Sequence, residues 1–336
     1  MSQLKYKVYS VWSVDWMSRV CNILTLTSTG CLPQQVHLIP SNQIIPRNHP
    51  KITAMATDGN HSRVEKYAVV TGANKGIGLE TVRQIASKGV TVVLTARDEK
   101  RGTDATCMLH NTGLTNVVFH QLDVLDPVSI ESLAKFIKDR FGKLDILVNN
   151  AGASGVVVDE ERLKALNIDP ETWLSGKAVN MVQQKLSSRF CSFLLSGARI
   201  VNVSSLRGEL CRIRGDDLRN ELEDLETLNE EKLDSILKRF LKDLKESTLE
   251  SGGWSLMLPA YSISKATLNA YTRVLAKRHP GMLINCVHPG YVNTDINWHT
   301  GPMPVEEGAR GPVKCALLPD GGPSGCYFDQ TEVASF

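Results

Sequence analysis

Short apolar runs alternate with longer amphipathic segments from Tyr67 to the end of the chain. The runs are rich in Val, Ile and Leu without polar alternation, which is typical of strands buried on both faces. We predict seven strands, at 67–71, 91–95, 117–121, 145–149, 199–204, 283–287 and 325–328. The helices predicted between them span 77–88, 98–110, 129–141, 180–195, 259–279 and 305–318.

This alternation predicts an α/β fold, because strands without an exposed face need helices on both sides of a parallel sheet. Right-handed crossovers then give a doubly wound, Rossmann-type sheet of about seven strands. We expect residues 61–336 to form this single domain. Ligands of such sheets bind at the carboxyl ends of the strands, so the candidate chemistry is sought there.

A charged stretch interrupts the pattern between residues 206 and 258. Its leucines at 218, 222, 225, 228, 233 and 237 recur at mostly helical spacing. We predict a helical insertion of two amphipathic helices on one edge of the domain. A solvated decoration and a lid over the substrate fit this pattern equally well.

Residues 1–60 lack both periodicities, and Asp15 is the only acidic residue before Asp58. We expect this segment to lie outside the fold. A plastid transit peptide over 1–54 is one interpretation, but Arg19 and Arg47 are few for an Arg-rich helix. We favour a disordered or mis-assigned extension, with translation starting at Met55.

The 38 basic and 36 acidic residues leave a net charge of +2, which favours small-molecule chemistry over nucleic acid or an anionic membrane. The eight cysteines are scattered, without a C-x-x-C pair or a histidine cluster at zinc spacing, so no metal site is expected. We interpret them as reduced thiols in the cytoplasm. No apolar run is long enough to span a membrane.

A glycine-rich turn, Thr71-Gly72-Ala73-Asn74-Lys75-Gly76-Ile77-Gly78, joins the first predicted strand to a helix. Glycines let the backbone approach a pyrophosphate closely, and the helix N-terminus favours its negative charge. The position between strand and helix makes a dinucleotide site the best interpretation. Gly72, Asn74, Lys75, Gly76, Ile77 and Gly78 are its predicted ligands.

Cofactor choice depends on the end of the second strand, where an acidic residue would bind the ribose 2′-hydroxyl of NAD. The sequence has Arg97 there, and Lys75 adds a second cation, so a 2′-phosphate is favoured and NADPH is predicted. Asp98 follows at once, and we expect it to cap the next helix.

Two further strand ends should line the same cleft. Asp123, with Val124 beside it, can accept a hydrogen bond from the adenine amino group. Asn149, Asn150, Ala151 and Gly152 end the fourth strand, where small and amide side chains admit the adenosine ribose. Either stretch could also be a plain turn.

Tyr261 and Lys265 lie four residues apart on one face of a predicted helix. A lysine ammonium nearby favours the phenolate of a tyrosine that would otherwise ionise near pH 10.

The Tyr261–Lys265 pair alone is common, but here it is one of five motifs along the chain. In order, these are the glycine turn, Asn149-Asn150-Ala151-Gly152, Asn202-Val203-Ser204-Ser205, the Tyr261–Lys265 pair and Pro289-Gly290. The ensemble resembles the short-chain dehydrogenase/reductase family over residues 67–336. The insertion and the ending Leu317-Leu318-Pro319-Asp320-Gly321-Gly322-Pro323 resemble its plant subgroup of mostly monomeric carbonyl reductases, the salutaridine and menthone/neomenthol reductases.

The resemblance implies roles for these residues. Tyr261 would protonate a carbonyl oxygen as hydride arrives from NADPH, and Lys265 would hold the nicotinamide ribose. Ser205 would hydrogen-bond the carbonyl oxygen, whereas strand alternation turns Ser204 to the other face. Pro289, Gly290, Val292 and Thr294 would hold the carboxamide and phosphates.

The chain departs from the family before the serine strand, where the usual asparagine context is missing and the segment is shorter by about one helix. Asn180, which lies 25 residues before Ser205, is the candidate replacement, with helix capping as the alternative. We therefore expect a monomeric, cytoplasmic NADPH-dependent reductase of a small terpenoid- or alkaloid-like ketone or aldehyde. A catalytically weak or inactive NADP-binding protein is the alternative, and a scaffold without cofactor is a third possibility.

Overall fold

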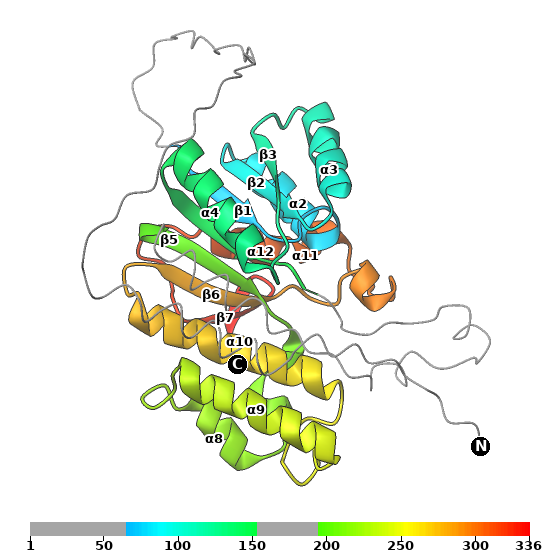
Figure 1. Cartoon of the computed structure of the whole chain (residues 1–336), viewed down its shortest axis with the longest axis vertical. Coiled ribbons are helices and arrows are strands. Elements are labelled where there is room, and N and C mark those ends of the chain that lie inside the picture. The colour runs from blue at the N-terminus through cyan, green and yellow to red at the C-terminus, as the bar shows by residue number, and fades with distance from the viewer. Residues whose placement is uncertain (1–64, 153–193) are drawn as a thin grey trace, which may run out of the picture. The chain divides into compact units, whose positions relative to one another are not determined.

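The computed structural model describes residues 65–152 and 194–336, all of which belong to one compact unit that runs from Ser62 to Phe336 (Figure 1). The predicted N-terminal extension, the candidate Asn180 and most of the predicted helix 180–195 lie outside the described residues.

The described part of the chain contains one sheet with the order β3-β2-β1-β4-β5-β6-β7-β8. Its strands are β1 (Tyr67–Val70), β2 (Thr91–Ala96), β3 (Val117–Gln121), β4 (Leu144–Asn149), β5 (Leu194–Val203), β6 (Leu283–His288), β7 (Tyr327–Asp329) and β8 (Glu332–Ala334). All neighbouring pairs from β3 to β7 are parallel. The order reverses between β1 and β4, the point at which ligands of doubly wound sheets bind. The predicted fold class is confirmed.

Two details of the predicted sheet were wrong. The short β8 pairs antiparallel with β7 and adds an eighth strand, which its three exposed residues do not signal. The predicted helix 180–195 cannot extend to its end, because β5 already begins at Leu194. Its leucines continue a helical spacing, and a short apolar run does not distinguish helix from strand.

Helices cover both faces of the sheet (Figure 1). On one face, α2 (Gly76–Ala86), α3 (Glu99–Asn111) and α12 (Arg310–Ala316) contribute to one apolar core. On the other, α4 (Pro127–Phe141) and α10 (Pro259–Arg278) contribute to a second. The predicted helix 305–318 is divided into α11 (Val305–Gly308) and α12. No described helix is long and apolar enough to cross a bilayer.

The insertion contains two helices, as predicted: α8 (Asp216–Glu223) and α9 (Glu230–Glu246). They follow two short 3-10 turns, η1 (Leu206–Gly208) and η2 (Leu210–Arg212), and a third turn, η3 (Asp295–Asn297), follows β6. Leu222, Leu233, Ile236 and Phe240 are almost fully buried in the core that includes α10. The leucine pattern therefore reflects packing against α10.

Candidate active site

A cavity of about 1160 Å³ lies at the carboxyl ends of the parallel strands. Every described residue that the sequence suggested as a ligand lines it: the glycine turn, Arg97, Asp123 and Val124, Asn150 to Gly152, Ser205, Tyr261, Lys265, and Pro289 to Thr294. No residue of α8 or α9 is among the described residues that form its wall. Strand ends far apart in the sequence thus share one cavity.

The glycine turn after β1 is shaped so that side chains would block it. Gly72 and Gly76 have φ of +61° and +57°, in the left-handed region that favours glycine. A Cβ on Gly72 would lie 2.8 Å from the Cα of Ala151, and one on Gly78 would lie 2.3 Å from the side-chain nitrogen of Asn150. The turn precedes the N-terminus of α2, so its backbone can approach an anion closely.

Asn150 and Thr71 hold this turn against the end of β4. The Asn150 amide donates to the carbonyl oxygens of Thr71 (2.9 Å) and Gly72 (3.1 Å). In return, the Thr71 hydroxyl accepts from the backbone N–H groups of Asn150 (3.1 Å) and Ala151 (2.9 Å). The motifs at the ends of β1 and β4 are therefore parts of one structure.

Arg97 follows β2 directly and is exposed at the cavity wall. Asp98 accepts a hydrogen bond from the backbone N–H of Arg101 (2.8 Å), which confirms that it caps α3. The carboxylate of Asp123 accepts from the N–H of Leu125 (2.9 Å) within its own turn. Arg97 therefore lines the cavity beyond β2 while Asp98 is engaged at its helix.

Tyr261 and Lys265 lie in the first turns of α10, beside Ser205 at the end of β5. The Lys265 Nζ is buried, donates to the carbonyl oxygen of Val203 (2.9 Å) and lies 5.7 Å from the centre of the Tyr261 ring. Burial lowers the pKa of Lys265 to about 8. Burial also raises the pKa of Tyr261, while a hydrogen bond with Ser205 and the charge of Arg207 act to lower it. On balance the pKa of Tyr261 is raised, so its hydroxyl is protonated at neutral pH.

The two serines after β5 point to different partners. The Ser204 hydroxyl donates to the side-chain oxygen of Asn269 (2.5 Å) and is buried against α10. A second buried chain runs from Asn149 to Asn202 (2.8 Å) and from Asn202 to Thr272 (2.9 Å). These bonds fix α10, and with it Tyr261, relative to β4 and β5.

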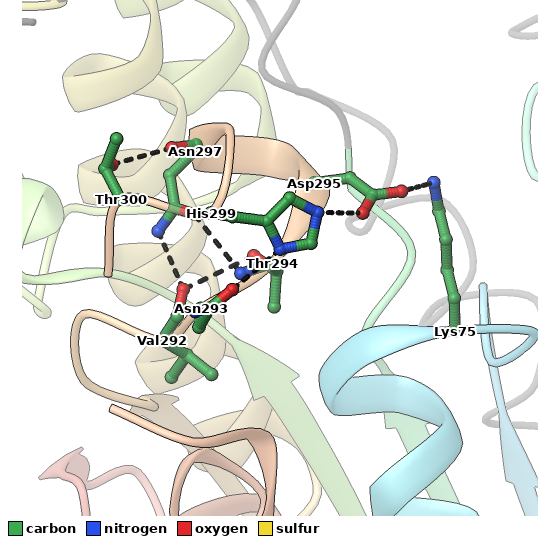
Figure 2. A network of polar contacts seen from close by, with 8 residues as sticks. All are labelled: Lys75, Val292, Asn293, Thr294, Asp295, Asn297, His299 and Thr300. Atoms are coloured by element: carbon green, nitrogen blue, oxygen red, sulfur yellow. Dashed lines mark hydrogen bonds and ion pairs between the residues drawn. The ribbon is translucent and has the colours of Figure 1, made fainter. Parts of the chain in front are cut away.

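The loop after β6 returns to the glycine turn (Figure 2). Lys75 forms an ion pair with Asp295, whose other oxygen lies 2.9 Å from His299 Nε2. The Asn297 side chain donates to the Val292 carbonyl oxygen (2.7 Å) and its oxygen accepts from Thr294 N–H (3.3 Å). Lys75 lowers the pKa of Asp295, so this carboxylate is ionised at neutral pH.

Sequence reasoning missed Arg207, Asp295 and His299, all of which line the cavity. No motif identifies them, since each lies in an irregular turn. The available signal was their position after a strand whose end leads into predicted ligands: Arg207 lies within four residues of β5, and Asp295 and His299 lie within eleven residues of β6. Within residues 65–152 and 194–336, no cluster of His, Cys, Asp or Glu could hold a metal ion.

The short chain dehydrogenase family model matches residues 66–215. Short-chain dehydrogenase/reductase 1 of Saponaria officinalis is 48% identical over 301 residues, covering 84% of this chain and 100% of its own length. (+)-Neomenthol dehydrogenase of Arabidopsis thaliana is 45% identical, over 81% of this chain and 98% of the relative.

The solved structure of salutaridine reductase from Papaver somniferum is 42% identical, with a TM-score of 0.69 over 79% of this chain and 99% of that one. Carbonyl reductase [NADPH] 3 of Mus musculus is 38% identical, over 77% of this chain and 93% of its own. The family model spans the glycine turn and β1 to β5, and the relatives are covered over 93% or more of their own length. The chain therefore belongs to the short-chain dehydrogenase/reductase family.

Proposed function

We propose that this oxidoreductase uses NADPH to reduce the ketone or aldehyde of a small terpenoid- or alkaloid-like molecule to an alcohol. One observation carries the proposal: Tyr261 and Ser205 line the same cavity as the glycine turn. A proton donor and a dinucleotide cradle in one cavity suit hydride transfer to a carbonyl.

The residues at the cofactor end fit NADPH. The glycine turn leaves space that a Cβ at Gly72 or Gly78 would fill, and α2 points its N-terminus at this space. Arg97 and Lys75 supply positive charge for the 2′-phosphate, and the loop after β6 adds Thr294, Val292, Pro289 and Gly290 to the cavity wall. The relative from Mus musculus carries NADPH in its name.

When bound, NADPH supplies the hydride. Tyr261 donates its phenolic proton to the carbonyl oxygen, and Ser205 hydrogen-bonds the same oxygen as negative charge develops there. The raised pKa of Tyr261 keeps its hydroxyl protonated at neutral pH, which suits reduction better than oxidation. Lys265 would hold the nicotinamide ribose.

A second candidate is an NADP-binding protein with weak or no turnover. The alignment with the Saponaria officinalis relative is 301 positions long, which is more than the 84% of this 336-residue chain that it covers. Some of its positions are therefore residues of the relative that this chain lacks. Asn180, the proposed replacement for the family asparagine, lies outside the described residues.

The test is NADPH oxidation by the full chain with a panel of cyclic ketones, quinones and aldehydes. Tyr261→Phe keeps the ring but removes the proton, so kcat should fall at least about 100-fold while NADPH binding persists. NADPH binding without turnover in the unmodified protein would favour the second candidate. Equal turnover by Tyr261→Phe would exclude the mechanism.

We also propose a monomer in the cytoplasm. The helices α8 and α9 bury their apolar residues against α10, which leaves this side of the domain covered within one chain. Size-exclusion chromatography with light scattering tests the first point. Imaging of a tagged full chain tests the second, with plastid import expected if residues 1–54 act as a transit peptide.

A further inference from the structure

Arg207 occupies a rigid position beside the proposed proton donor. It lies in η1, two residues after Ser205, and its backbone N–H donates to the Ser205 hydroxyl (3.2 Å). The next residue, Gly208, is pressed against α10, because a Cβ there would lie 2.8 Å from the Lys265 carbonyl oxygen. Asn269 also donates to the Gly208 carbonyl oxygen (3.1 Å). The turn that carries Arg207 is therefore fixed to the helix that carries Tyr261.

The guanidinium of Arg207 is half-buried in the cavity wall, and no described residue forms a hydrogen bond or ion pair with it. Other arginines of the insertion have carboxylate partners, such as Arg212 with Glu209 (3.0 Å) and Arg239 with Glu221 (2.6 Å). An arginine stays charged at any ordinary pH, and a charge withdrawn from water needs a partner. Arg207 thus presents up to five unused donors to whatever occupies the cavity.

The strand order separates Arg207 from the proposed 2′-phosphate site. Arg97 follows β2 and Arg207 follows β5, with β1 and β4 between these strands. Three strand spacings amount to about 14 Å. Arg207 instead interacts electrostatically with Tyr261, where the carbonyl would be reduced.

The surroundings of Arg207 define the group it can bind. The described acids in the cavity wall are Asp123 and Asp295, and both have partners elsewhere. Apolar side chains of the wall include Leu206, Leu258, Ile296 and Trp298. The nearby cations have partners of their own, since Arg212, whose charge acts on Arg207, is paired with Glu209, and Lys265 donates to the Val203 carbonyl oxygen. At this end of the wall Arg207 is left as one cation beside apolar groups, which matches the single charge of a carboxylate, whose two oxygens fit the guanidinium fork. A phosphate, with a charge between −1.5 and −2, would favour several cations.

We propose that Arg207 binds a carboxylate of the substrate, so that the enzyme prefers carbonyl compounds that combine an apolar skeleton with an acid group. This inference rests on the proposed reductase function. It narrows the substrate class from neutral ketones to oxo acids and places the acid group on the side of Tyr261 that faces η1.

Matched substrate pairs test the inference: 3- and 4-oxocyclohexanecarboxylate against their methyl esters, which carry the same ketone. We expect the full chain to favour at least one acid over its ester by about tenfold or more in kcat/KM, as a charge-assisted pair would provide. Arg207→Met should bring that ratio to about one, and Arg207→Lys should keep part of it. Arg214→Met removes the same charge from an exposed residue outside the cavity wall and should keep the full ratio.

Three results would overturn the inference: equal use of acid and ester by the unmodified protein, an equal loss on both by Arg207→Met, or a higher KM for NADPH in that variant. The second would mean that Arg207 acts through Tyr261, and the third that it binds the cofactor. If no ketone is turned over, the reductase proposal fails separately. In that case, calorimetry measures the binding of the acid and of the ester to the NADPH-loaded protein. Tighter binding of the acid that is lost in Arg207→Met would support the inference, and equal binding of acid and ester would refute it.

Discussion

The glycine turn after β1 and the turn after β5 line the same cavity, yet they form their walls differently. The first presents backbone, since Gly72, Gly76 and Gly78 have no side chains to place there. The second presents side chains, Ser205 and Arg207, on a turn fixed to α10. A cofactor shared by many enzymes can be bound by backbone, whereas a substrate particular to one enzyme is distinguished by individual side chains.

The comparison predicts that charge at the cofactor end selects between cofactors without affecting the chemistry. Arg97→Asp replaces an attraction for the 2′-phosphate with a repulsion, so the NADPH to NADH ratio of kcat/KM should fall about 10- to 100-fold. Kinetics with both cofactors and one ketone provide the measurement. The acid to ester ratio serves as the control and should stay the same, because Arg97 and Arg207 follow different strands. Equal use of NADH and NADPH by the unmodified protein would refute the role of Arg97.

A substitution without charge should distinguish the two ends further. Gly78→Ala places a Cβ 2.3 Å from the Asn150 amide and 2.8 Å from the Gly72 carbonyl oxygen. We expect the Kd of NADPH to rise about tenfold or more, with a loss of about 1–3 kcal/mol in stability from overpacking. Calorimetry and denaturant unfolding measure the two effects.

Gly113→Ala is the matched control for this variant. Gly113 has φ of +90° with nothing near its missing Cβ, so alanine should cost about 1 kcal/mol of stability and leave the Kd alone. If both variants bind NADPH normally, close backbone approach is not what the glycine turn provides.

The same contrast explains which features could be predicted from the sequence. The strands β1 to β6, the glycine turn and the Tyr261–Lys265 pair follow from burial and from fixed spacing, and these elements lie close to where we predicted them. Arg207 and Asp295 lie in turns where no periodicity applies, and their neighbours come from distant segments such as α10 and the glycine turn. β8 and the start of β5 were missed because pairing, rather than local pattern, defines them.

Lys265 tests whether a buried charge that serves the reaction lowers the stability of the fold. Its pKa falls from 10.5 to about 8, so below pH 8 the folded protein carries a buried charge that the unfolded chain carries in water. This shift means that the buried charge costs the folded protein on the order of 3 kcal/mol of stability. Lys265→Met removes that cost but also removes the hydrogen bond to Val203, so only part of it is regained. We expect the variant to be about 1 kcal/mol more stable than the unmodified protein at pH 7 while losing turnover.

The pH dependence gives the sign of this effect. The gain should shrink between pH 8 and pH 10.5, because over that range the folded unmodified protein has lost the lysine proton while the unfolded chain still carries it, so the stability of the unmodified protein rises with pH. Denaturant unfolding at pH 7 and pH 10 measures it. Lys265→Arg, which keeps a charge at both values, should be less stable than Lys265→Met at either pH. A gain for Lys265→Met that does not change with pH would mean that packing, and not the charge, is responsible.

The smallest expected effect concerns Asp295, which joins the loop after β6 to the glycine turn through Lys75 (Figure 2). Both side chains are more than half exposed, so their ion pair adds little to stability. It does oppose cofactor binding, because Asp295 must share Lys75 with the cofactor phosphates and adds a negative charge beside them. Asp295→Asn should therefore lower the Kd of NADPH about threefold at low salt, and the gain should fade as salt screens the exposed charges. Titrations of NADPH at low and high ionic strength measure this.

His299→Gln is the control, since it removes the other partner of the Asp295 carboxylate and leaves the charge of that carboxylate in place, so no gain is expected. Weaker NADPH binding by Asp295→Asn at both salt concentrations would show that Asp295 instead holds the loop after β6 in the form that binds the cofactor.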